Sequence, residues 1–249
     1  MSLLRRLLHA DSGTIVGLHN APTREKWVEA EMRSLPTGSR LLDAGAGECQ
    51  FRRFCEHLQY VSQDFAQYDG SGDRSGLQTG KWDTSQIDLI CDIVNIPEPD
   101  QSFDAILCTE VLEHLPEPQL ALKEFARLLR PGGRLIMTAP FMSLTHFAPY
   151  HFATGFNRYF YLHHLEKHGF TDIEIIENGN FFEFIAQELR RVDGCARQYA
   201  GSRLSWFQRH AVNVLLAALE RFSSLDRGSK ELCNFDLQVT AVRSAEMCQ

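Results

Sequence analysis

Short apolar runs and segments with helical spacing alternate along this chain. Runs rich in branched and aromatic residues predict strands at 40–44, 59–63, 86–91, 103–108, 133–139 and 171–177, with a last strand within 231–243. Apolar residues three and four apart predict helices near 49–58 and 117–130 between some of these strands. Strands that alternate with helices favour a parallel sheet with both faces covered, so we expect an α/β fold.

Three further segments flank or interrupt this alternation. Thr23 can cap a helix that starts at Arg24 and ends before Pro36. Residues 65–85 carry four glycines and no periodicity, which predicts a long loop that is either a functional lid or disordered. Residues 204–225 place apolar side chains three and four apart, which predicts an amphipathic helix. Such a helix can pack on the core or form a lid, make a dimer interface, or attach to a membrane surface.

The chain length of 249 residues is enough for one large core, so we expect a single domain over 1–249. In this interpretation a helical segment at 1–38 precedes a core at 39–178. A helical insertion at 180–228 then separates the core from the final strand at 231–243.

Charge and cysteine content narrow the range of partners. The net charge of −7 disfavours nucleic acid, because affinity for a phosphate backbone comes mainly from Lys and Arg. Seven cysteines without CxxC spacing indicate free thiols in a reducing compartment. The first residues, MSLLRRLLHADSG, make a poor signal peptide, and the apolar stretch near 214–219 is too short to span a bilayer. We therefore expect a cytoplasmic protein without an integral membrane segment.

The segment LLDAGAGECQFR, residues 41–52, is the first indication of a ligand. An apolar run ends in Asp43, turns through Gly45 and Gly47, and continues into a helical pattern. In an α/β protein, two residues without side chains at this point let a cofactor lie against the backbone. Asp64 ends the next apolar run, at the position where an acidic residue holds a ribose. These residues predict a nucleotide-like cofactor.

The spacing of the glycines bears on which cofactor this is. A dinucleotide fingerprint, GxGxxG, that begins at Gly45 needs a third glycine at the position of Gln50. That glycine lets the helix press against the strand and bring its amino terminus to a pyrophosphate. Its absence weakens the prediction of NAD, whereas a cofactor without phosphates does not need it.

A longer segment, residues 91–140, carries the blocks SFDAILCTEVLEHL and LLRPGGRLIMTAP. Together with LLDAGAG, these blocks resemble the class I S-adenosylmethionine-dependent methyltransferases, specifically the type 11 branch. The resemblance runs from about residue 40 to 178 and keeps the order and spacing of the family's blocks. It implies a Rossmann-like three-layer sandwich with a mostly parallel seven-stranded sheet and an antiparallel last strand. It also implies S-adenosyl-L-methionine as the cofactor.

The resemblance further implies roles for the residues around the glycines. Gly45, Ala46 and Gly47 would form the turn under the methionine and ribose parts of the cofactor. Asp43 would lie near the ammonium group, and Asp64 would accept hydrogen bonds from the ribose hydroxyls. The alternative for Asp64 is a turn or a helix cap.

Four residues further along the chain complete the implied cofactor site. Asp92 would meet the adenine amino group, and Ile93 would supply a backbone contact and an apolar wall. Thr109 and Glu110 would border the methionine end. For Asp92 a turn is again the alternative, because Asp–Ile–Val–Asn before Pro97 is also turn chemistry.

The chain departs from the family pattern at Cys49, where many members carry another glycine. Its side chain can crowd the cofactor or point into the packing, and we favour packing because a thiol behaves as a small hydrophobe. His114 in EVLEHL can be a general base or have a structural role.

The loop after the fifth central strand faces the carboxyl ends of the strands, where ligands bind in a parallel sheet. It contains His146, Tyr150 and His151 among five phenylalanines. We predict that these three residues are catalytic, with either histidine taking a proton from a hydroxyl or amine. The alternative is an aromatic cover with solvated histidines. His164 and His168 are four apart but lack a third ligand, so we predict no metal site.

These patterns predict a methyltransferase that moves a methyl group to a small-molecule acceptor by in-line displacement. Positioning and exclusion of water carry most of the catalysis, because the methyl donor is already activated. Two alternatives stay open, an NAD-dependent oxidoreductase on a Rossmann sheet and a non-catalytic methyltransferase-like scaffold. The acceptor, the methylated atom and the oligomeric state are also open, with a homodimer through 204–225 as one option.

Overall fold

The computed structural model describes residues 13–245 of the chain. Residues 1–12, with the arginine-interrupted apolar run considered above as a signal peptide, and residues 246–249 lie outside the described part. Two compact units divide the chain. The smaller unit comprises Met1–Thr23 and Glu177–Phe235, and the larger one comprises Arg24–Ile176 and Asp236–Gln249.

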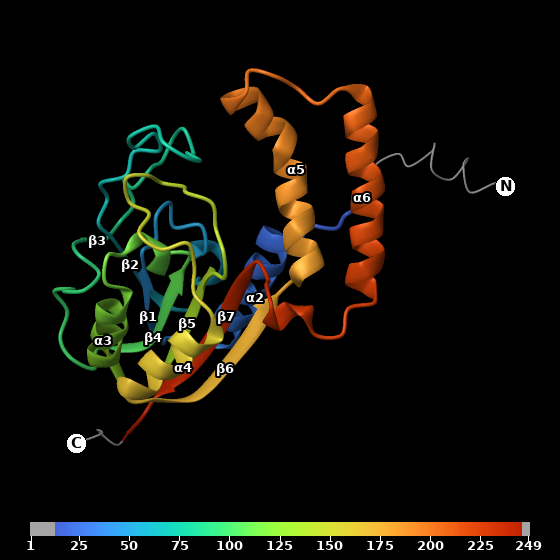
Figure 1. Ribbon diagram of the computed structural model, residues 1–249. Helices are drawn as coiled ribbons and strands as arrows, with labels where there is room; N and C mark the ends of the chain where they lie inside the picture. Colours follow the sequence, from blue (N-terminus) through green and yellow to red (C-terminus); the bar gives the residue numbers. More distant parts are fainter. Residues whose placement is uncertain (1–12, 246–249) are drawn as a thin grey trace. The chain divides into compact units, whose positions relative to one another are not determined.

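A seven-stranded sheet has the strand order β3-β2-β1-β4-β5-β7-β6 (Figure 1). The strands are β1 (Arg40–Ala44), β2 (Gln59–Asp64), β3 (Leu89–Ile90), β4 (Phe103–Thr109), β5 (Leu129–Pro140), β6 (Phe170–Asn178) and β7 (Asp236–Arg243). Strand β1 pairs in parallel with β2 and β4, β2 with β3, and β4 with β5, whereas β7 is antiparallel to β5. The predicted mostly parallel sheet with an antiparallel last strand is confirmed.

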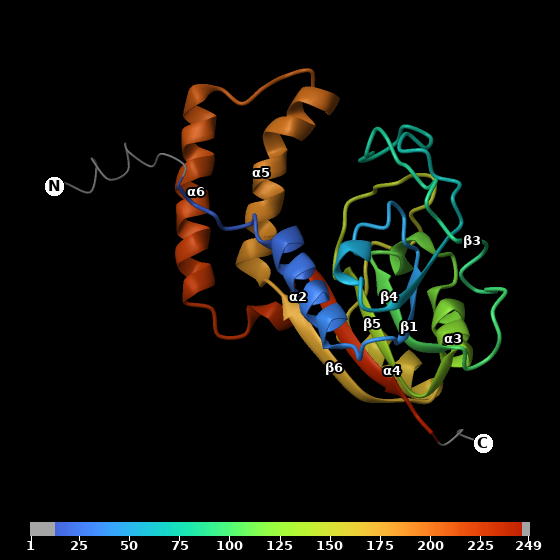
Figure 2. The same cartoon turned by 180° about the vertical axis from the view of Figure 1, so that it is seen from behind.

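Both faces of this sheet are covered by helices. The flanking helices are α2 (Asn20–Ser34), α3 (Pro118–Leu128) and α4 (Arg158–Lys167). Successive strand residues point to opposite faces, so Leu42 packs in one core with Phe125 of α3, while Leu41 packs in another with Met32 of α2. Helices α3 and α4 lie on one face and α2 on the other (Figures 1 and 2). This arrangement confirms the predicted three-layer sandwich.

The helix predicted over 49–58 is wrong. Within this segment the structure has turns and one short 3₁₀ helix, η1 (Arg52–Phe54). Cys49 has a left-handed φ of 53°, which an α-helix does not tolerate. The backbone hydrogen bonds that follow span three residues, as in a 3₁₀ helix, and not four.

Other bounds also differ from the prediction, for local reasons. Helix α2 starts at Asn20, three residues before the predicted cap. Strand β3 has only two residues, because the Asp88 carboxylate accepts hydrogen bonds from the Ser62 amide (2.9 Å) and hydroxyl (2.7 Å) in place of further strand pairing. The last strand starts at Asp236, after a 3₁₀ turn, η3 (Ser229–Glu231).

The smaller unit contains the helices α5 (Phe181–Tyr199) and α6 (Trp206–Ser224). Ser205 caps α6 in a capping box with Gln208, which confirms the start of the predicted helix. Its small core brings together Val16, Ala186 and Leu216.

The apolar stripe predicted on this helix does not form the core. Phe207 is 77% exposed, Leu215 54% and Leu225 67%. Leu216 and its neighbour Leu219 pack on the small core instead. The stripe therefore belongs to the surface of the described chain. Between residues 13 and 245, no helix has the length and apolar character needed to cross a membrane.

Candidate functional site

A cavity of about 470 Å³ lies in the larger unit, at the carboxyl ends of β1, β2 and β4. Strand order reverses direction between β1 and β4, and ligands of parallel sheets bind outside the strand ends at this point. The volume is in the range of small-molecule sites. Nine of the predicted site residues line the cavity: Gly45, Ala46, Gly47, Asp64, Ile93, Thr109, Glu110, His146 and Tyr150.

The turn after β1 forms the floor of the cavity. The amides of Gly45 and Ala46 both donate to the carbonyl oxygen of Gln63 at 2.9 Å, which ties the turn to the end of β2. Gly45 has a φ of +75°, and a Cβ at this position would lie 2.4 Å from the side chain of Val111. Only glycine fits here without strain.

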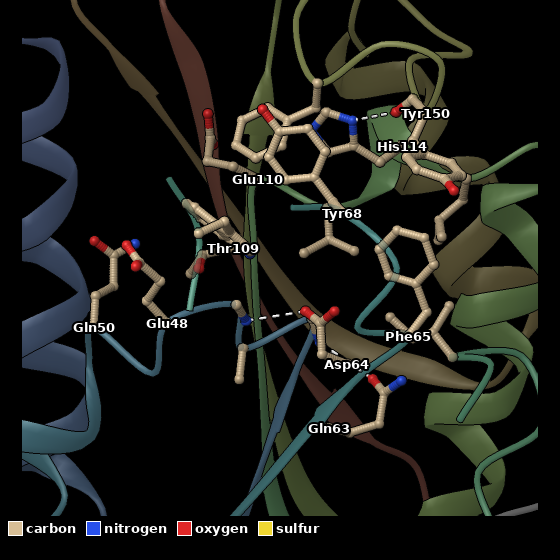
Figure 3. A pocket seen from close by; sticks show the side chains of 18 of the residues that line it. Glu48, Gln50, Gln63, Asp64, Phe65, Tyr68, Thr109, Glu110, His114 and Tyr150 are labelled. Atoms are coloured by element: carbon tan, nitrogen blue, oxygen red, sulfur yellow. Dashed lines mark hydrogen bonds between the residues drawn. The ribbon is translucent and has the colours of Figure 1, made fainter. Parts of the chain in front are cut away.

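Asp64 is fixed beside this turn at the end of β2. The amide of Gly47 donates to its Oδ2 at 3.0 Å (Figure 3). The amide of Ala66 donates to Oδ1 at 2.8 Å. The residue is 8% exposed and lines the cavity. A carboxylate accepts more than one hydrogen bond per oxygen, so each oxygen retains capacity for a ligand hydroxyl.

Asp43 lies behind the turn and does not line the cavity. It is 1% exposed and accepts a hydrogen bond from the Tyr60 hydroxyl at 2.5 Å. Burial raises the pKa of Asp43 to about 7, although the Tyr60 hydrogen bond acts in the opposite direction. The predicted contact of Asp43 with an ammonium group stays a prediction.

Charged side chains form a network beside the cavity, at the end of β4. Glu110 accepts a hydrogen bond from the Thr138 hydroxyl at 2.9 Å, and its other carboxylate oxygen lies 3.1 Å from the guanidinium of Arg24. Arg24 also contacts the buried Asp236 at 3.1 Å. Sequence reasoning missed Arg24, a lining residue whose partners are distant in the chain.

Aromatic side chains from two loops cover the cavity. The ring of Phe147 lies 4.4 Å from that of Tyr68 and 5.2 Å from that of Trp82, between ring centres. Both partners come from the loop at 65–85, and a β-bridge between Leu77 and His146 ties the two loops together. The long loop is thus part of the cavity wall, as the functional alternative expected.

Histidines gather on the same side of the cavity. His114, in the 3₁₀ helix η2 (Leu112–His114), and His146 both line it, with their ring centres 4.7 Å apart. Burial, with the charge of His146, lowers the pKa of His114 to about 4. Burial also acts to lower the pKa of His146, but the carboxylate of Glu113 outweighs it and the pKa is raised. Burial raises the pKa of Glu113 itself to about 7.

Besides Asp43, two predicted site residues stand outside the cavity lining. The carboxylate of Asp92 is exposed and accepts a hydrogen bond from the Val94 amide at 3.1 Å, which is the turn alternative. His151 shares a hydrogen bond of 3.1 Å with the Ser143 hydroxyl, and its ring centre lies 4.8 Å from that of His146. Cys49 is buried and does not line the cavity, which agrees with packing.

The strand order, the antiparallel β7 and the helices on both faces define a Rossmann-like fold. A solved structure of a SAM dependent methyltransferase from Archaeoglobus fulgidus has this fold, with a TM-score of 0.53 and 16% identity, over 91% of this chain and 98% of that one. Residues 42–137 match the family model described as a methyltransferase domain.

Curated relatives are similar over about half of the chain. The chain is 32% identical over 120 residues to a ubiquinone biosynthesis O-methyltransferase of Xanthomonas axonopodis, a match that covers 47% of this chain and 48% of the relative. It is 33% identical over 125 residues to the 27-O-demethylrifamycin SV methyltransferase of Amycolatopsis mediterranei, which covers 48% and 45%. The chain spans about half the length of the curated relatives it matches.

Proposed function

We propose that this protein is an S-adenosyl-L-methionine-dependent methyltransferase acting on a small-molecule acceptor by in-line displacement. One observation carries the proposal: the glycine turn after β1 and the carboxylate of Asp64 lie in one cavity, joined by the Gly47 amide at 3.0 Å. This pair offers bare backbone and a hydrogen-bond acceptor for a ribose diol, next to each other.

The shape of the turn favours a cofactor without a diphosphate. A dinucleotide needs the amino terminus of a helix at this turn, because its amides and dipole hold the pyrophosphate. Here the segment after the turn is a run of 3₁₀-type bonds that begins at Cys49. Gln50 also lines the cavity where the fingerprint would have its third glycine.

The lining residues match the parts of the proposed cofactor. Asp64 accepts the ribose hydroxyls, and Ile93 supplies an apolar wall for adenine. At the methionine end, Arg24 has the charge to attract the carboxylate, and Glu110 the charge to attract the ammonium and sulfonium groups.

The acceptor then occupies the aromatic side of the cavity. Its nucleophilic atom forms a bond to the methyl carbon while the carbon–sulfur bond breaks and sulfur keeps the electron pair, leaving S-adenosylhomocysteine. Tyr150 and His146 lie on this side, and His151 is next to His146. We assign these residues to positioning the acceptor and receiving its proton.

Calorimetric titration tests the cofactor assignment. The wild-type protein should bind S-adenosylmethionine and S-adenosylhomocysteine and show no heat with NAD. Asp64→Asn should weaken both affinities, while Glu166→Ala, which removes an exposed carboxylate of α4 outside the cavity lining, should leave them unchanged. Uptake of NAD alone would establish the oxidoreductase alternative.

A screen with isotope-labelled methyl donor tests the reaction. Phenolic, amino-aromatic and aliphatic small molecules are incubated with the protein and the label is traced into products. Transfer to any of them supports the enzyme. Cofactor binding with no S-adenosylhomocysteine produced over a broad panel would favour the non-catalytic scaffold.

The remaining expectations concern assembly and location. The exposed Phe207, Leu215 and Leu225 on α6 support a homodimer through 204–225, because exposed apolar side chains gathered on one helix are typical of contact surfaces. The six cysteines in the described residues are free thiols, which supports a reducing, cytoplasmic environment. That the acceptor is a small molecule and not a nucleic acid is part of the same proposal.

A further inference from the structure

Three potential metal ligands converge at the wall of the cavity. Glu113, His114 and His146 each offer one ligand atom, and these atoms all lie within 4.8 Å of one another. The first two follow β4 in the 3₁₀ helix η2, and the third comes from the loop after β5. The cluster was not predicted from the sequence, because its residues come from two segments that are far apart in the chain.

The hydrogen bonds of the two rings determine which nitrogen faces the cluster. Nδ1 of His114 lies 2.5 Å from the carbonyl oxygen of Tyr150, and Nδ1 of His146 lies 2.8 Å from that of Leu144. A carbonyl oxygen only accepts hydrogen bonds, so Nδ1 carries the hydrogen in both rings. In the neutral rings Nε2 then carries a free lone pair, and both Nε2 atoms lie within 4 Å of the same oxygen, Oε1 of Glu113.

The carboxylate between these lone pairs is buried. The side chain of Glu113 is 0% exposed, and neither of its oxygens has a hydrogen-bond partner among the residues that the structure describes. Its Oε1 lies 3.7 Å from Nε2 of His114 and 3.8 Å from Nε2 of His146, beyond hydrogen-bond range. When Glu113 is ionised, its nearest cationic neighbour is a protonated His146 at 3.8 Å. A buried carboxylate is poorly stabilised at that distance, and a metal ion held between the three side chains would stabilise it better.

We propose that Glu113, His114 and His146 bind a divalent first-row transition metal such as Zn²⁺. Two imidazole nitrogens and one carboxylate oxygen are a common ligand set for a catalytic zinc ion, which keeps a further position open. The ligand atoms of tetrahedral zinc are roughly 3.4 Å apart, so binding requires only a small contraction of the cluster. The Nδ1–carbonyl bonds orient the rings, as the outer hydrogen bonds of metal-binding histidines do.

The open position identifies an acceptor class, and this step rests on the proposed methyltransferase function. His114 and His146 line the cavity, so a fourth ligand reaches the metal from the acceptor side. A bound metal lowers the pKa of a coordinated hydroxyl, so with His146 acting as a ligand the proton passes to water and not to His146. The resulting oxygen anion forms the bond to the methyl carbon as the carbon–sulfur bond breaks. The inferred acceptor is therefore a hydroxylated molecule that is methylated on oxygen.

Zinc titration of the chelator-treated full chain tests the site without any turnover. The wild type should bind one Zn²⁺ per chain, and His146→Ala and Glu113→Gln should each lower that affinity at least about 10-fold. His163→Ala, an exposed histidine of α4 outside the cluster, should have no effect. Replacing zinc by Co²⁺ should give a visible absorption band that both cluster variants lose.

Two further measurements keep this proposal separate from the proposed function. Circular dichroism and the melting temperature check that each variant is folded, and His114→Ala replaces Glu113→Gln should the latter not fold. S-adenosylhomocysteine affinity of the metal-free protein should equal that of the untreated protein, whatever the zinc result. Equal zinc affinity of the wild type and the folded cluster variants, or no stoichiometric binding, would overturn the metal site and leave the cofactor assignment standing.

Discussion

The two halves of the cavity are built from different parts of the polypeptide. On the cofactor side the backbone of the turn after β1 forms the surface, and Asp64 is held by the amides of Gly47 and Ala66. On the acceptor side, the surface is formed by side chains from the loops at 65–85 and 141–157. The proposed cofactor would thus contact mainly the backbone of the turn. The proposed acceptor would contact loops, whose sequence can change without changing the sheet.

The match with the family model covers most of the cofactor half of the cavity but only part of the acceptor half. It includes the loop at 65–85 and ends at residue 137, before the loop that carries His146 and Tyr150. The variants below test each half separately.

Gly45→Ala should lower the affinity for S-adenosylhomocysteine at least about 100-fold, as the sum of backbone strain and steric overlap. The new Cβ would lie 2.4 Å from Val111, at a φ of +75°. Gly132→Ala is the matched control, because Gly132 has a φ of +77° but no atom within 4 Å of its added Cβ. Calorimetry on both folded variants compares their affinities for S-adenosylhomocysteine. An equal loss of affinity in Gly45→Ala and Gly132→Ala would contradict the role of the turn.

His146→Ala should lower the turnover number about 100-fold and leave cofactor affinity within threefold, because it removes a group that activates the acceptor, and activation of a nucleophile is worth about 10²–10⁴-fold. The measurement is kcat with the acceptor found in the screen, together with the dissociation constant of S-adenosylhomocysteine. A large loss of cofactor affinity with unchanged turnover would place His146 in the other half.

Asp64→Asn should weaken S-adenosylhomocysteine binding about 10- to 100-fold, because hydrogen bonds to charged groups are worth about 1.5–3 kcal/mol. The side-chain amide retains one acceptor oxygen, so only one of the two backbone amides that donate to Asp64 loses its partner. Asp64→Ala should have the larger effect, since both backbone donors lose their partner. Affinity within twofold of the wild type in Asp64→Asn would show that the carboxylate does not hold the ribose.

Asp43→Asn should stabilise the cofactor-free protein above pH 7 by up to about 4 kcal/mol, and by less as the pH falls toward 4. The pKa of Asp43 is about 7 in the fold against 3.8 ordinarily, so the folded state holds a proton that the unfolded chain releases. The contribution of this carboxyl to stability is therefore lost as pH rises from about 4 to 7. Urea unfolding of both proteins across this range checks the sign, and a pH-independent difference would contradict it.

Asp92→Asn should change cofactor affinity less than threefold. The exposed carboxylate accepts the Val94 amide, and an amide oxygen can do the same, so the turn survives. This variant decides between the adenine contact predicted from the family and the turn. A loss as large as that of Asp64→Asn, measured in the same calorimeter, would restore the adenine contact.

Local patterns were enough to predict the sheet and the cofactor half. Gly45 and Gly47 indicate a turn because glycine readily adopts the positive φ angles that both residues have. The strands were predicted from runs of branched and aromatic residues. The helix at 49–58 failed because its apolar spacing does not reveal that Cys49 is left-handed. No local pattern could show that Arg24 meets Glu110, since they are brought together only by the packed fold.

The acceptor half escaped prediction for the same reason. His146 was identified as a candidate by the aromatic residues around it in the sequence. Its proximity to Glu113 depends on the three-dimensional arrangement of two segments that are distant in the chain. The sequence also offered no sign that Glu113 would be buried without a hydrogen-bond partner in the described structure, since a glutamate in a turn is usually solvated.

A crystal structure of the protein with S-adenosylhomocysteine would show directly whether the cofactor binds in this cavity. We expect the ribose hydroxyls within hydrogen-bond distance of the Asp64 carboxylate, with the ligand against the backbone of the turn at Gly45 and Gly47. A cavity that stays empty at saturating ligand, or a ligand bound elsewhere on the protein, would contradict it.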